Sequence, residues 1–141
     1  MKSLKLFFVL WGMWMYFSSA VVITRFEFAR AVGRLVHSRQ PLLMRFTEGT
    51  WWITDRVYHV VEFTILSMLA LKLSPYLQKR PFALIPMALL IGAADEYHQL
   101  LVNAGAAHTY DVLIDAIGAG VVLWVYVRGS IKRESMTAIV A

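Results

Sequence analysis

Ionisable and hydrogen-bonding side chains gather in three short segments of an otherwise apolar chain. The candidate ligand-binding residues in these segments are His59, Glu62, Asp95, Glu96, His98, Gln99, Asp111 and Asp115. Carboxylates and imidazoles carry acid–base chemistry, bind cations and form hydrogen bonds to polar ligands. Many of these residues are three or four positions apart, which places them on one face of an α-helix. The spacing therefore predicts one polar site that is built from three helices.

Three kinds of role are open to these residues. They could bind a lipid-linked or envelope ligand, or they could serve structure alone by holding three helices in register. In an enzyme, His59, Glu62, Glu96 and His98 would bind a metal, or a glutamate and a histidine would act as acid and base. The chain has no His-Glu-x-x-His run and no serine or cysteine nucleophile with an apparent partner. The sequence therefore assigns no catalytic residue, no cofactor and no metal site.

The charges of the polar segments do not balance. Five carboxylates, those of Glu62, Asp95, Glu96, Asp111 and Asp115, accompany one arginine, Arg56. These acids cannot all stay ionised in a site of low dielectric constant. Some must be protonated, paired with a protonated histidine, placed at a helix start or bound to a cation or cationic ligand. Asp111 is predicted to be an N-cap or first-turn residue, which the helix dipole favours.

The overall composition indicates a membrane protein. The chain has 141 residues, of which 59% are hydrophobic and 16% are charged, and it lacks cysteine. An ordinary soluble domain is about 45–50% apolar and about 25% charged. This composition excludes disorder, a disulfide scaffold and a fibrous repeat. The net charge of +5 comes without a continuous basic face, so we expect contact with the lipid bilayer and not with nucleic acid.

Four apolar segments predict an all-α membrane bundle that forms a single domain over residues 1–141. The expected transmembrane helices are 6–23, 57 to about 77, 81 to about 99, and 111–127. The first is interpreted as a retained helix and not a signal peptide, because its apolar run continues beyond Ser18-Ser19-Ala20. It carries no charge, so we expect it to contribute little to the polar site and to contact lipid or a partner protein.

The direction of the helices places all three polar segments at one membrane face, because consecutive spans alternate in direction. Eight lysines and arginines fall on the side of the N-terminus and six on the other, which predicts that both termini are cytoplasmic. Apolar residues at helical spacing within residues 25–36 predict an amphipathic helix in the first external loop. A solvated connector with scattered arginines is the alternative for that loop.

The polar segments also resemble a known family. Asp95-Glu96-Tyr97-His98-Gln99, followed by a short loop and Asp111-Val112-Leu113-Ile114-Asp115-Ala116-Ile117-Gly118-Ala119, resembles the signature of the VanZ-like bacterial membrane proteins. The segment 55–63, which reads DRVYHVVEF, is similar to the family's second-helix pattern, and the motif-bearing part is 51–127. Family members often carry a Pro-Gly-Arg-like turn after the glutamine, whereas residues 103–108 here read NAGAAH.

The resemblance implies a small multi-pass protein of the bacterial inner membrane. Members of the family are linked to resistance against the glycopeptide teicoplanin and to the cell envelope. It thus favours a lipid-linked or envelope ligand for the polar site. The alternatives are an accessory subunit of a larger membrane complex and a metal-dependent membrane enzyme.

Overall fold

The computed structural model is all-helical over the residues it describes, which are 2–21, 24–37, 40–102 and 108–140. Its elements are α1 (Lys2–Ser19), α2 (Arg25–Leu35), α3 (Pro41–Leu73), α4 (Pro75–Lys79), the 3-10 turn η1 (Pro81–Ala83), α5 (Leu84–Val102) and α6 (Asp111–Val140). The prediction of an all-α protein is confirmed.

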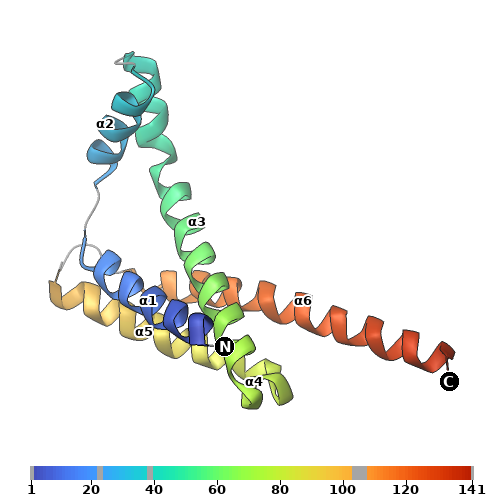
Figure 1. Ribbon diagram of the computed structural model, residues 1–141. Helices are drawn as coiled ribbons and strands as arrows, with labels where there is room; N and C mark the ends of the chain where they lie inside the picture. The colour runs from blue at the N-terminus through green and yellow to red at the C-terminus, as the bar shows by residue number, and fades with distance from the viewer. Residues whose placement is uncertain (1, 22–23, 38–39, 103–107, 141) are drawn as a thin grey trace.

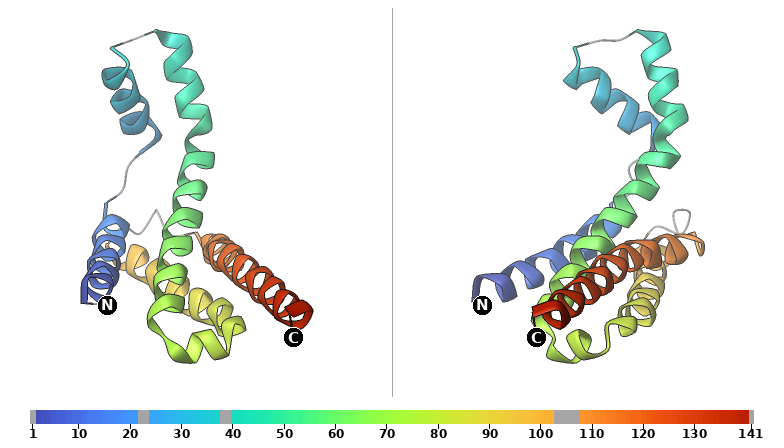
Figure 2. Two further views of the ribbon diagram at one scale, coloured as in Figure 1. Left: turned by 45° about the vertical axis from the view of Figure 1, so that its right-hand side comes forward. Right: turned by 90° about the vertical axis from the view of Figure 1, so that its right-hand side faces the viewer.

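The helices form a bundle, beyond which α2, the N-terminal half of α3 and the C-terminal part of α6 extend (Figure 1). Helices α1, α5 and α6 pack around the C-terminal half of α3, and α3 contacts all three. Helix α2 packs beside the N-terminal half of α3, away from the other helices, as both views in Figure 2 show. Helix α3 therefore connects the bundle to α2.

Local chemistry sets two of the helix ends. Helix α2 begins with a capping box, in which the Thr24 side chain accepts from the backbone N–H of Glu27 and the Glu27 carboxylate accepts from that of Thr24. The hydrogen bonds from the backbone and side chain of Thr24 lower the pKa of Glu27. The predicted amphipathic helix in this loop is present, although it ends at Leu35.

Helix α3 differs from the predicted helix at both ends. It begins at Pro41, whose missing N–H is tolerated in the first turn, and it ends at Leu73. The prediction of a continuous helix to about residue 77 is wrong, because Pro75 disfavours helical geometry at Ser74. The Ser74 hydroxyl instead accepts from the N–H of Leu77 and caps the short α4.

The core of the bundle lies where α3 meets α5 and α6. Phe63, Leu84, Ala88 and Ala119 are fully buried there. Gly118 permits the close contact of α3 and α6, because a Cβ atom at this position would lie 2.6 Å from the Val60 carbonyl oxygen. The small residue therefore sets how closely the two helices approach.

One helical segment among the described residues, Asp111–Lys132, is long and apolar enough to span a membrane by length and composition. The neighbouring helices carry polar groups near their ends: Lys2 and Lys5 in α1, Asp95 and Glu96 in α5. These groups lower the mean hydropathy of both helices. Large apolar side chains nevertheless remain exposed on α1, α5 and α6, including Phe17 (60%), Leu90 (73%) and Leu113 (65%).

Candidate functional site

A cavity of about 790 Å³ lies where α1, α3, α5 and α6 meet below the projecting α2. Its aromatic lining residues are Trp14, Phe17, Phe28, Trp51, Trp52, Tyr58 and Tyr110. Its ionisable and amide lining residues are Asp55, Arg56, His59, Glu62, Asp95, Gln99, His108 and Asp111. The cavity thus combines an apolar aromatic wall with a polar surface.

His59 and Asp115 connect α3 to α6 beside this cavity. The His59 Nδ1 atom lies 3.0 Å from Asp115 Oδ1, and the two residues are 8% and 0% exposed. The second oxygen of Asp115 has no hydrogen-bond partner in the described part of the chain. A Cβ atom at Gly92 would lie 2.5 Å from that oxygen, so the glycine gives the carboxylate its space between α5 and α6.

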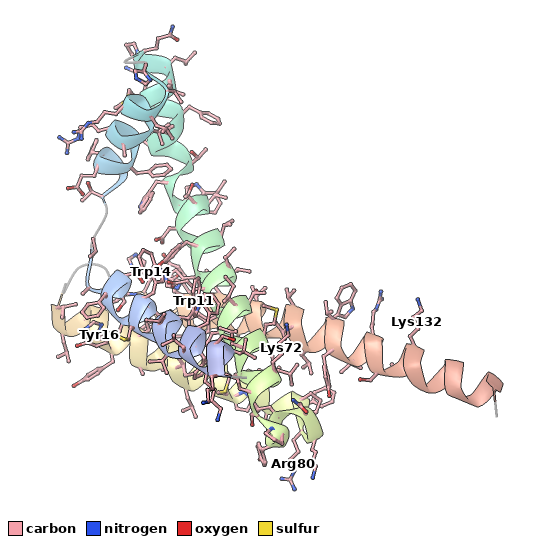
Figure 3. The ribbon with its side chains drawn as sticks, in the orientation of Figure 1. Trp11, Trp14, Tyr16, Lys72, Arg80 and Lys132 are labelled. Atoms are coloured by element: carbon pink, nitrogen blue, oxygen red, sulfur yellow. The ribbon has the colours of Figure 1, made fainter. Side chains whose placement is uncertain are left out.

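Glu62 is the point at which α1 joins the polar residues. Its Oε1 atom accepts hydrogen bonds from the Tyr58 hydroxyl and, at 3.2 Å, from the Ser18 hydroxyl. Trp11 donates to the Glu62 backbone carbonyl over 3.2 Å, and Trp14 donates to the Tyr58 hydroxyl over 3.1 Å. Figure 3 shows Trp11 and Trp14 on the part of α1 beside α3.

The prediction that the first helix contributes little to the polar site is therefore wrong. Its hydroxyl and indole groups supply the donors that the Glu62 carboxylate and its neighbours need. The prediction was based on the absence of charged residues from the first helix, so it did not take uncharged hydrogen-bond donors into account.

The polar residues at the C-terminal end of α5 make their contacts in three different places. Asp95 accepts a 3.0 Å hydrogen bond from Gln99, and both residues line the cavity. Glu96 is buried at 7% exposure, and its Oε2 atom accepts from the backbone N–H of His108 over 2.6 Å. His98 lies against α1, where its Nδ1 atom is 2.8 Å from the Ser19 hydroxyl and its ring stacks on Tyr16.

The structure thus sorts the eight predicted residues by position. His59, Glu62, Asp95, Gln99 and Asp111 line the cavity. Glu96 and Asp115 are buried and are not among the lining residues, and His98 faces α1. The predicted place of Asp111 in the first turn of α6 is confirmed.

The aromatic wall is the part of the site that the sequence analysis missed. Trp51 and Trp52 lie in α3 upstream of the apolar run, and Phe28 lies in α2, where its ring packs 4.9 Å from that of Trp51. Tryptophans next to a predicted span are typical of the membrane interface, and this enrichment is the signal that could have located them.

Arg56 is held by aromatic rings and a carbonyl. Its guanidinium carbon lies 4.7 Å from the centre of the Tyr110 ring and 5.6 Å from that of Trp52. Its Nη1 atom donates to the Trp52 carbonyl over 2.8 Å. Among the residues that the structure describes, no carboxylate lies within 4.0 Å of this guanidinium. The acidic groups of the cavity are therefore not neutralised by direct pairing with Arg56.

Three possible metal ligands also come together. Asp55, His59 and Asp111 each offer one ligand atom, and these atoms lie within 4.8 Å of one another. This set shares only His59 with the four residues considered for a metal-dependent enzyme on sequence grounds. Residues 103–107, which hold most of the loop that departs from the family pattern, lie outside the described residues.

Comparisons with known proteins bear on the whole chain. The model of the VanZ/LLP1 family matches residues 4–132. No curated protein and no solved structure gives a match. The family match includes every predicted site residue and nearly the full length of the chain, so this protein belongs to the VanZ/LLP1 family.

Proposed function

We propose that the chain spans the inner membrane four times, through α1, the C-terminal half of α3, α5 and α6, with both termini cytoplasmic. The exposed apolar side chains of α1, α5 and α6 support contact with lipid. At about 1.5 Å per residue, the 33 residues of α3 measure about 50 Å, more than the roughly 30 Å hydrocarbon core. The N-terminal part of α3 and α2 would then stand at the outer surface.

The positions of basic residues support the same orientation. Arg80 lies at the end of the bundle opposite α2, as Figure 3 shows, and Lys72 lies in the last turn of α3. Lys79 belongs to the same short connection. Basic residues concentrated in a short loop are typical of the cytoplasmic side.

A reporter fused after residue 141 tests this topology. We expect a reporter that functions only in the cytoplasm to be active, and one that functions only in the periplasm to be inactive. A reporter inserted between α5 and α6 should show the opposite pattern. Periplasmic activity of the C-terminal fusion would contradict the proposed orientation.

We propose further that the cavity binds a lipid-linked envelope saccharide joined to its lipid through phosphate. The single observation that carries this proposal is the cavity itself, which has an aromatic wall and a polar surface. Its volume of about 790 Å³ falls in the range of about 300–1,000 Å³ that is usual for ligand sites. An amphipathic ligand matches both kinds of lining at once.

The lining chemistry suggests how such a ligand would lie. Arg56 is placed for its phosphate, and the aromatic wall would contact its apolar parts. Asp95 and Glu62 are hydrogen-bond acceptors that suit sugar hydroxyl groups. The link of this family to glycopeptide resistance is consistent with an envelope ligand.

Replacement of Arg56 by glutamine tests the phosphate contact. We expect Arg56→Gln to weaken binding of a short-chain polyprenyl-phosphate sugar by about tenfold or more, because a charge-assisted hydrogen bond contributes about 1.5–3 kcal/mol. Binding is measured by calorimetry on the full chain in detergent, with the same polyprenol lacking phosphate as a second ligand. The phosphate-free ligand should bind both proteins equally.

Arg128→Gln is the matched control, since Arg128 also lies over an aromatic ring, that of Trp124, but outside the cavity. Equal losses for the two variants would contradict a specific phosphate contact. Absence of saturable binding to the wild type would overturn the ligand proposal. A stoichiometric protein partner recovered in mild detergent would then favour the accessory-subunit alternative.

A further inference from the structure

The group formed by Asp55, His59 and Asp111 is a mixed set of two carboxylates and one imidazole. It joins α3 and the first turn of α6, and ligand atoms of all three residues lie within 4.8 Å of one another. All three side chains line the cavity. Carboxylate and imidazole together suit divalent transition metals, whereas calcium and magnesium prefer oxygen ligands alone.

The hydrogen bond of His59 to Asp115 prepares the ring for a metal. The Nδ1 atom is engaged by the buried Asp115 carboxylate at 3.0 Å, which leaves Nε2 as the ring's remaining ligand atom. Histidines that bind metals usually donate their other N–H to a carboxylate or carbonyl in this way. Such a partner fixes the tautomer and the orientation of the ring and makes it a better ligand.

Asp111 supplies an independent observation that points to a cation. This residue is buried, with only 4% of its surface exposed. Its Oδ1 atom nevertheless accepts no hydrogen bond from the residues that the structure describes. A buried carboxylate oxygen without a partner is costly, and a cation at the cavity surface would satisfy it.

In the described part of the chain, no lysine or arginine pairs with Asp55 or Asp111 in the place of such a cation. The guanidinium of Arg56 is directed to the Tyr110 ring and to the Trp52 carbonyl, and it pairs with neither Asp55 nor Asp111 at 4.0 Å or less within the described chain. Within the described chain, the two carboxylates therefore lie beside His59 without an ion pair to a lysine or arginine.

We propose that Asp55, His59 and Asp111 bind one divalent transition-metal ion of the Zn²⁺ type. With three protein ligands, the ion would keep an open coordination position toward the cavity. Asp115 acts as the positioning residue for His59 and does not itself contact the ion. This proposal requires no lipid ligand, so it can fail or succeed separately from the proposed function.

Titration of the metal-free full chain with Zn²⁺ in detergent tests the site. Calorimetry should show saturable binding of about one equivalent to the wild type. Asp55→Asn and Asp111→Asn should each weaken this binding by at least about tenfold, because each removes a charged ligand. Co²⁺ should bind to the same position and give a visible absorption spectrum that the two variants lose. Ca²⁺ at equal concentration should not displace Zn²⁺.

Asp95→Asn is the matched control, because Asp95 lines the same cavity but does not belong to the three-residue group. It should leave Zn²⁺ affinity within about twofold of the wild type. The melting temperature of each metal-free variant shows whether it is folded, and the half-buried Asp55 decides the outcome if Asp111→Asn does not fold. No Zn²⁺ binding, equal losses in Asp95→Asn and Asp55→Asn, or ready displacement by Ca²⁺ would overturn the proposal.

Discussion

Replacing Gly118 with alanine is expected to lower the free energy of unfolding by about 3 kcal/mol, the upper end of the usual cost of overpacking. The new Cβ atom would lie 2.6 Å from the Val60 carbonyl oxygen and 2.8 Å from the Thr64 nitrogen. Both are backbone atoms of α3, so neither can turn away as a flexible side chain would. The two helices must separate, which also lengthens the hydrogen bond between His59 and Asp115.

Gly120→Ala is the control for this prediction. Gly120 lies two residues further along α6, and a Cβ atom there would meet nothing within 4 Å. Alanine at that position should be neutral or stabilise the helix by up to about 1 kcal/mol. Thermal unfolding in detergent, followed by tryptophan fluorescence, measures both variants. Equal melting temperatures for the two would mean that α3 and α6 are not in close contact at Gly118.

Removal of the His59 imidazole is expected to destabilise the protein by about 3–5 kcal/mol, because it leaves a buried carboxylate without its partner. Asp115 is fully buried, and its Oδ1 atom lies 3.0 Å from the His59 Nδ1 atom of α3. His59→Ala should therefore lower the melting temperature far more than a substitution at an exposed histidine.

A double-mutant cycle distinguishes the interaction energy of His59 and Asp115 from the loss of general packing. Asp115→Ala combined with His59→Ala should cost less than the sum of the two single changes, because the double variant buries no unpaired charge. The coupling between the two sites is read from the unfolding free energies of the four proteins. Additive effects would show that the two side chains act independently.

The sequence predicts much of the polar site because its residues recur at helical spacing. His59 and Glu62 on α3 both line the cavity, and the start of α6 is correctly placed at Asp111. The amphipathic α2 was also predictable, since its apolar residues follow a helical period. In each case the prediction depends only on the spacing of residues within one or two helical turns.

Two kinds of feature could not be predicted: helical segments without a long apolar run, and contacts between residues far apart in the sequence. The N-terminal part of α3, from Pro41 onward, lacks a long apolar run, so a search for apolar spans does not detect it. The three-residue group of Asp55, His59 and Asp111 depends on how α3 and α6 approach each other. No local spacing encodes that distance.

The serine hydroxyls at the end of α1 have a consequence for the order of assembly. Their partners Glu62 and His98 follow Ser18 and Ser19 by 44 and 79 residues, respectively. At about 5–20 residues per second, roughly 4–16 s of synthesis separate Ser19 from His98. Each hydroxyl also lies 3.0 Å from a carbonyl oxygen of its own helix, at Met15 or Tyr16, to which it can donate in place of its later partner. The first helix can therefore enter the bilayer with these hydroxyls already satisfied and wait there until the later helices arrive.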